Sequence, residues 1–211
     1  MGALAWLRAN PGPFAQALGE HLLLSATGLM LGIAIGLPLG LLVARRAGMA
    51  EAAIAVAGLL RTLPSLAILA ALLPLLGVGF TPSVVALAVV ALPPVLVNTI
   101  IGLRGADAEA LDAATGLGMT PAQRLLRVEL PLAAPMVFAG LRIAAVQVVS
   151  GAALATFIGG GGLGDLVTQG VALLDTGQIL VGATAIALLA LGTEFALGGL
   201  ERAAAAWSGA A

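Results

Sequence analysis

The sequence predicts an all-α membrane protein with five transmembrane helices. Of its 211 residues, 61 % are hydrophobic and only 9 % are charged, whereas about a quarter of the residues in a soluble domain are charged. Crossing a hydrocarbon core of about 30 Å takes roughly 20 helical residues, and five apolar stretches are long enough. We expect these spans at residues 22–44, 53–77, 83–103, 134–157 and 178–199.

The first 20 residues differ from these spans because prolines and polar residues interrupt them. They lack the continuous apolar core of a cleavable signal peptide. With Trp6 and Phe14 among polar neighbours, residues 1–18 are typical of a short extracytoplasmic or interfacial segment. A membrane domain over 19–200 and a short cytoplasmic tail over 201–211 complete the expected organisation.

The arginines orient the spans. Because consecutive spans alternate in direction, the connections at 45–52 and 104–133 lie on the same side as the C-terminus. Cytoplasmic loops of membrane proteins carry the excess of basic residues. The predicted cytoplasmic side holds Arg45, Arg46, Arg104, Arg124, Arg127 and Arg202, whereas the opposite side holds Arg8 alone. The N-terminus is therefore predicted to lie outside.

In the first span, glycine recurs at every fourth position, at Gly28, Gly32, Gly36 and Gly40. Residues four apart lie on one face of a helix. Small residues on such a face let two helix backbones approach closely, and close packing drives helix association in lipid. We expect this face to pack against another span.

The connection after the third span concentrates charge. Asp107 is suited to cap a short helix with Glu109 in its first turn, and the helix is expected to stop at Gly116 or Gly118. Seven charged residues fall within positions 104–129: Arg104, Asp107, Glu109, Asp112, Arg124, Arg127 and Glu129.

A second short helix is expected to follow this glycine turn. Thr120 and Gln123 have the spacing of a capping box, with Pro121 at the first helical position. An apolar face follows at Leu125, Leu126, Val128 and Leu130. Pro131 is expected to end this helix, so the segment reads as helix, glycine turn, helix. On spacing alone, an amphipathic connector at the membrane surface is an equally good interpretation.

The same segment resembles the EAA loop of permease subunits of ATP-binding-cassette importers. That motif runs Glu-Ala-Ala, three residues, Gly, nine residues, Ile-x-Leu-Pro, and every spacing agrees here. This chain has Asp in place of Glu and Val in place of Ile, both conservative changes. The matching residues are Asp112, Ala113, Ala114, Gly118, Val128, Leu130 and Pro131.

Three further stretches resemble the branch of these permeases that imports glycine betaine, choline, carnitine and related osmoprotectants. They are RTLPSLAILAALLPLLGVG (61–79), LPPVLVNTIIGL (92–103) and FIGGGGLGDLVTQG (157–170). The resemblance covers roughly residues 19–200. It implies the layout of a small type I importer permease, similar to methionine permeases, in a prokaryotic cytoplasmic membrane.

The resemblance also implies partners and a mechanism. Two permease subunits, identical or homologous, would form the pathway, and each EAA helix would sit in a groove of a cytoplasmic ATPase subunit. ATP and Mg²⁺ would bind to that ATPase, so this chain is expected to hold no cofactor. An extracytoplasmic binding protein would deliver the solute. Import of another solute such as methionine stays open, and so does a channel or secondary transporter, although no inverted repeat favours the latter.

Other activities find little support in the sequence. With no cysteine and a single histidine, His21, the chain lacks the usual ligands for a thiolate or histidine metal centre, and no basic run tracks nucleic acid. The glycines at 159, 161 and 164 match a dinucleotide fingerprint without its strand–helix context. Asp165 follows a Gly-x-Gly element as in intramembrane proteases, but no second aspartate lies within a span. We therefore expect no enzyme.

Polar residues within the spans are functional candidates because they are expensive to bury in lipid. Arg61, Arg142 and Glu194 fall toward the cytoplasmic third of their expected helices. An ion pair of Arg142 with Glu194 would neutralise both. The uncharged candidates for the pathway, or for interhelical hydrogen bonds, are Asn98, Gln147, Ser150 and Thr156.

The chain is poor in aromatic residues. It has no tyrosine, five phenylalanines, and two tryptophans near its ends, Trp6 and Trp207. Quaternary ammonium ligands are usually held by several aromatic faces. We expect weak binding of any betaine by this chain, with high-affinity recognition in a separate protein.

Overall fold

The computed structural model describes residues 2–208, which are helical along nearly their whole length and contain no strand. The helices are α1 (Ala3–Ala9), α2 (Pro11–Val43), α3 (Ala47–Thr62), α4 (Ser65–Leu76), α5 (Phe80–Arg104), α6 (Ala108–Gly116), α7 (Pro121–Arg124), α8 (Leu130–Gly151), α9 (Leu163–Ala172) and α10 (Thr176–Ser208). A π-helical turn η1 (Leu125–Glu129) leads into α8, and a 3₁₀ segment η2 (Ala152–Ile158) follows it.

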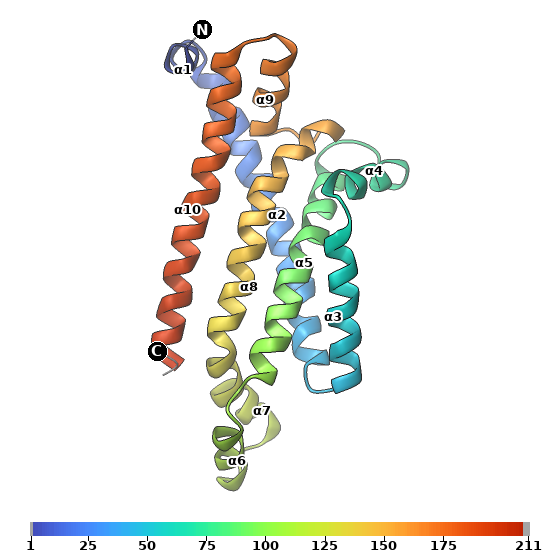
Figure 1. Ribbon diagram of the computed structural model, residues 1–211, viewed down its shortest axis with the longest axis vertical. Helices are drawn as coiled ribbons and strands as arrows, with labels where there is room; N and C mark the ends of the chain where they lie inside the picture. The colour runs from blue at the N-terminus through green and yellow to red at the C-terminus, as the bar shows by residue number, and fades with distance from the viewer. Residues whose placement is uncertain (1, 209–211) are drawn as a thin grey trace.

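Within residues 2–208, four helical stretches are long and apolar enough to cross a membrane: α2, α5, the run from α7 to η2, and α10. In Figure 1 these long helices lie along one another, with α6 and α7 extending from one end and α1 and α9 at the other. α5 packs against α2 and α8, and α8 packs against α10. The predicted all-α membrane fold is confirmed.

The second expected span, residues 53–77, is not one straight helix. It is divided between α3 and α4, whose axes meet at 93°. Leu63 is extended with ψ 125°, because the ring of Pro64 disfavours helical backbone at the preceding residue. The 16 residues of α3 rise about 24 Å, less than the thickness of a hydrocarbon core of about 30 Å. The bend therefore lies within the depth of the membrane.

The first span begins earlier than predicted, at Pro11. Only α1 is separate, so the second half of the expected segment 1–18 is continuous with the helix of the first span. Asn10 makes the break: its side-chain amide donates to Trp6 O at 3.0 Å, and Pro11 then starts a new helix. Trp6 is buried with Leu163 and Val181, so α1 is packed on the bundle.

The last helix is longer than the predicted span 178–199, because α10 continues to Ser208. Residues 201–208 of the expected tail are thus helical, and 209–211 lie outside the described residues. The C-terminal end of α10 lies toward the same end of the bundle as α6 and α7, opposite the N-terminus (Figure 1).

The glycine face of the first span is confirmed as a packing surface. Gly28, Gly32, Gly36 and Gly40 are all buried. A Cβ added to Gly32 would lie 2.5 Å from Ala91 Cβ on α5, and one added to Gly40 would lie 2.7 Å from Thr99 Cβ. The two backbones are therefore closer than any side chain at these positions would allow. We call this contact the α2–α5 seam.

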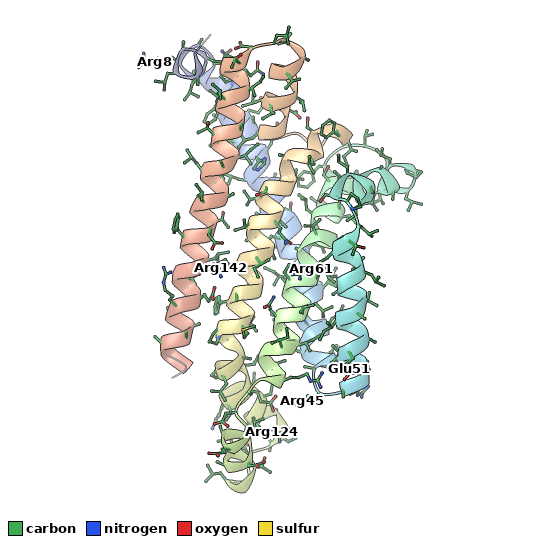
Figure 2. All side chains as sticks on the ribbon, in the orientation of Figure 1. Arg8, Arg45, Glu51, Arg61, Arg124 and Arg142 are labelled. Atoms are coloured by element: carbon green, nitrogen blue, oxygen red, sulfur yellow. The ribbon has the colours of Figure 1, made fainter. Side chains whose placement is uncertain are left out.

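Arg8 lies at the opposite end of the bundle from Arg45 and Arg124, as predicted (Figure 2). Figure 2 shows Arg8 at the end with α1, and Arg45, Glu51 and Arg124 toward the end with α6 and α7. The positive-inside rule then assigns the α6–α7 end to the cytoplasm.

The seam predicts a position-specific effect of one methyl group. Gly32→Ala should lower the free energy of unfolding by about 1–3 kcal/mol, because overpacking forces the backbones apart. Gly19→Ala is the matched control in the same helix, since nothing lies within 4 Å of its added Cβ. The measurement is the melting temperature of each purified variant. Equal melting temperatures for the two variants would contradict the close packing of α2 on α5.

Candidate functional site

The charged segment forms a cytoplasmic hairpin, which we define as residues 107–130. Asp107 caps α6, accepting from the Glu109 amide at 3.1 Å. After Gly116 the chain turns at Gly118, whose φ of +75° is left-handed, and the Met119 amide donates to Ala114 O at 3.2 Å. Such a turn favours glycine, because other residues are strained there. The predicted cap and glycine turn are confirmed.

The second half of the hairpin also begins as predicted. The Thr120 amide donates to Gln123 Oε1 at 2.9 Å, and the Gln123 amide donates to Thr120 Oγ1 at 3.3 Å. These two bonds are the capping box, and they fix the entry of the chain into α7.

The prediction that Pro131 ends this helix is wrong. The helix continues through η1 and Pro131 into α8. A proline in a regular α-helix clashes with the carbonyl four residues earlier. Here the wider π-helical turn precedes it, with the Leu130 amide donating to Leu125 O, and this widening makes room for the ring. The hairpin is thus continuous with a transmembrane helix.

A buried carboxylate fixes the hairpin to the bundle. The Glu129 side chain is only 6 % exposed, and its two oxygens pair with Arg45 Nη2 at 3.0 Å and Arg124 Nε at 2.9 Å. Arg124 Nη1 also lies 3.4 Å from Thr115 Oγ1 in α6. We call this set the Glu129 clamp. It joins the α2–α3 connection, both halves of the hairpin and the start of α8.

Sequence reasoning missed the Glu129 clamp, because Arg45 lies 84 residues from Glu129 in the chain. The only available signal was the charge itself, placed beside apolar residues. Those apolar residues pack as well: Leu125 and Leu130 lie against the buried cluster of Ala44, Leu103 and Ala133. The base of the hairpin therefore has both polar and apolar attachments.

The tip of the hairpin is exposed and partly apolar. Leu117, in the glycine turn, is 78 % exposed, and Leu126, nearer the base in η1, is 64 % exposed. Asp112, Ala113 and Gly118 are exposed too, whereas Ala114 is buried within the hairpin. Val128, Leu130 and Pro131, at its base, are half-buried. An exposed apolar tip on a rigid base is the kind of surface that another protein covers.

A second candidate site is a cavity of about 670 Å³ between α3, α4, α5 and η2 with α8. Gln147 and Ser150 from α8 line it, together with Arg61 from α3 and Ser65 from α4. None of the described residues that line it is aromatic. The cavity thus brings together Gln147 and Ser150, two of the four uncharged candidates, with Arg61, one of the three charged candidates.

The other two uncharged candidates lie elsewhere. The Asn98 side chain donates to Pro94 O at 2.8 Å. It packs against Gly140 of α8, where an added Cβ would lie 2.6 Å from Asn98 Cβ. Thr156 Oγ1 lies 3.2 Å from Thr168 Oγ1 and so links η2 to α9. Both make interhelical contacts.

Arg142 holds α8 to α10. Arg142 Nη1 pairs with Glu194 Oε1, and Arg142 Nε lies 2.8 Å from Glu201 Oε2. Sequence reasoning named the first partner and missed the second. Figure 2 shows Arg142 and Arg61 at about mid-height of the bundle, deeper than the cytoplasmic third expected from the sequence.

The glycine-rich segment at 159–164 packs closely against neighbouring elements. The Gly162 amide donates to Glu20 Oε2 at 3.1 Å, and the Gly79 amide donates to Ile158 O at 2.6 Å. A Cβ at Gly164 would collide with Ala153 O on the neighbouring turn. These glycines therefore serve close backbone contact. Across residues 2–208, no group of three or more His, Cys, Asp or Glu could hold a metal ion.

The comparisons with known proteins all match membrane components of transport systems. The family described as binding-protein-dependent transport system inner membrane component matches residues 36–203. The carnitine transport permease protein OpuCB of Listeria monocytogenes is 45 % identical over 182 residues, 86 % of this chain and 84 % of that protein. The choline transport system permease protein OpuBB of Bacillus subtilis is 41 % identical over 197 residues, 93 % of this chain and 91 % of that protein.

Solved structures show the same fold. A chain of the MetNI methionine ABC transporter, in an inward-facing conformation, superposes with a TM-score of 0.81 at 23 % identity, covering 91 % of this chain and 96 % of that one. At this identity the likeness concerns the fold alone. An amino acid ABC transporter with histidines gives a TM-score of 0.75 at 22 % identity, covering 96 % and 98 %.

The charged set around Arg142 predicts unequal effects of removing its members. Arg142→Gln leaves two carboxylates without a cation and should destabilise the protein by about 2–3 kcal/mol, the cost of a charge at this depth. Glu194→Gln leaves Arg142 paired with Glu201 and should cost less than about 1 kcal/mol. Melting temperatures of the two variants in lipid nanodiscs measure the difference. A Glu194→Gln variant as unstable as Arg142→Gln would contradict the shared pairing.

Proposed function

Because the chain belongs to the family of binding-protein-dependent transport system inner membrane components, we propose that it is the permease of an importer for a small osmoprotectant. The solute would be glycine betaine, choline, carnitine or a similar compound, as the names of its relatives suggest for those proteins. The chain is a multi-pass protein of the cytoplasmic membrane and is not itself an enzyme. Its family and fold indicate ATPase and other transporter components as partners.

The observation that carries this proposal is the cytoplasmic hairpin. Its exposed tip, with Ala113 and Leu117, would dock in a groove of the ATPase subunit. Its base is attached through Glu129 and is continuous with α8. A displacement of the tip would therefore move α8 and the end of α2 together, because a rigid element transmits motion to whatever it is packed against. ATP and Mg²⁺ would be held by the ATPase, with no cofactor on this chain.

A second permease subunit would complete the pathway. The cavity lined by Gln147 and Ser150 is open to the surface of this chain, and both side chains are exposed. Polar side chains at mid-membrane almost always face other protein or water. A subunit related by two-fold symmetry, identical or homologous, would enclose this cavity.

Solute recognition would lie mainly outside this chain. The cavity has no aromatic lining, and the exposed Phe157 and Phe195 lie outside it. An extracytoplasmic binding protein would supply an aromatic cage and dock on the outer surface, including residues 159–177. Transport would then run inward, because the binding protein delivers the solute on the outer side and the ATPase hydrolyses ATP on the cytoplasmic side.

The coupling surface supplies the first test. We expect proteoliposomes that hold this chain, its ATPase and its binding protein to take up glycine betaine only when ATP is present on the side of the membrane that carries the ATPase. Ala113→Arg should lower that uptake at least tenfold by blocking the groove contact, without preventing membrane insertion. Ala108→Arg is the matched control: it is exposed on the same helix but lies about 140° around it from Ala113.

Two outcomes would contradict this proposal. Uptake that persists without ATP would indicate a channel or secondary transporter. Normal uptake by the Ala113→Arg variant, with the ATPase still co-purifying, would show that the hairpin tip is not the docking surface.

A second test follows from the missing aromatic residues. The permease–ATPase complex without its binding protein should bind free betaine or choline only at about millimolar affinity or weaker, near 4 kcal/mol of binding free energy. Isothermal titration calorimetry of the complex measures this directly. Micromolar binding by the complex alone would contradict the assignment of recognition to a separate protein.

A further inference from the structure

Arg61 is a charged residue in the last turn of α3. It is exposed, and within residues 2–208 it has no hydrogen-bond or ion-pair partner. It follows Glu51 by ten residues on α3, or about 15 Å along the helix, which is half of a hydrocarbon core of about 30 Å. Figure 2 likewise shows it at mid-height, on the side of α3 that faces the rest of the bundle.

The depth of Arg61 restricts what it faces. An unpaired guanidinium at the middle of a bilayer is costly and faces a partner or a water-filled space. Arg61 lines the cavity described above, with Gln147 and Ser150 across from it on α8. The cavity therefore combines one fixed positive charge with two uncharged hydrogen-bonding side chains.

The bend between α3 and α4 adds further donors. Ser65 begins α4, a helix of 12 residues, and it also lines the cavity. Among the described residues the backbone amides of Ser65 and Leu66 donate to no carbonyl, whereas those of Ala67 and Ile68 donate to Pro64 O. Free amides at a helix N-terminus attract anions. The Arg61 guanidinium thus favours negative charge in the cavity, and Ser65 places the start of α4 at its wall.

No acidic side chain of this chain is available to meet Arg61. Six of the ten acids accept a hydrogen bond or pair with an arginine within the chain: Glu20, Asp107, Glu129, Asp175, Glu194 and Glu201. The other four lie in the first two turns of α3 or α9 or in α6 of the cytoplasmic hairpin: Glu51, Glu109, Asp112 and Asp165. An identical second subunit would therefore bring no unpaired acid to this depth.

We propose that Arg61, the start of α4 and Gln147 form a carboxylate-binding subsite in the solute pathway. Arginine holds a carboxylate through two parallel hydrogen bonds, and a cavity of about 670 Å³ has room for a small zwitterion such as glycine betaine or carnitine. The subsite would contact the carboxylate of these solutes and leave choline, which has none, without this contact. This inference rests on the proposed function.

The test compares two solutes in the reconstituted complex of permease, ATPase and binding protein. Arg61→Gln should lower the ratio of ATP-dependent glycine betaine uptake to choline uptake at least tenfold. Arg61→Lys keeps the charge and should retain at least a third of the betaine uptake. Arg46→Gln removes an exposed arginine at the other end of α3 and should leave the ratio unchanged.

Several outcomes would overturn the subsite. An unchanged betaine-to-choline uptake ratio in Arg61→Gln would do so. Equal betaine uptake by Arg61→Lys and Arg61→Gln would also overturn it. This second comparison needs no choline uptake, so it decides the question even if the complex does not transport choline. Equal loss of both solutes, with separation of the two permease subunits on size-exclusion chromatography, would show that Arg61 pairs with an acid of a non-identical partner. If the unmodified complex accumulates no solute with ATP, the proposed function itself fails.

Discussion

The buried carboxylate of Glu129 is the interaction on which the rest of this molecule depends. Its two oxygens hold Arg45 and Arg124, so one side chain connects the hairpin, the α2–α3 connection and α8. Because the Glu129 side chain is only 6 % exposed, removing both arginines would leave a buried carboxylate without a cation. A hairpin that is stiff at its caps and fixed at its base is able to transmit force, whereas a loosely attached amphipathic loop is not.

The α2–α5 seam extends that attachment into the membrane. Helices in lipid gain little from burying apolar surface, because lipid tails are equally apolar, so association relies on close packing. Gly36 and Gly40 place α2 against Val95 and Thr99 of α5, and Arg45 follows only two residues after α2 ends. The hairpin, α2 and α5 are thus joined in series, and α5 contributes to the wall of the mid-membrane cavity.

The sequence predicted what local chemistry determines and missed what depends on distant residues. The caps at Asp107 and Thr120 and the turn at Gly118 require only neighbours within five residues, and all are present. The Leu63–Pro64 pair disfavours helical backbone at Leu63, but the high average hydropathy of 53–77 predicted one continuous span. Pro131 was misjudged because the sequence does not reveal the π-helical turn before it. The Glu129–Arg45 pair, and the placement of Gln147 and Ser150 apart from Asn98 and Thr156, follow from how the helices pack and not from any local pattern.

The most direct test of this account is the number of solute molecules imported per ATP hydrolysed when the Glu129 clamp is removed. Glu129→Gln in the reconstituted complex should leave the ATPase bound and hydrolysing ATP, while uptake per ATP falls at least fivefold. Glu109→Gln, an exposed acid on α6, is the control and should keep the ratio. Unchanged uptake per ATP in the Glu129→Gln variant would contradict the claim that this clamp carries motion from the hairpin to the bundle.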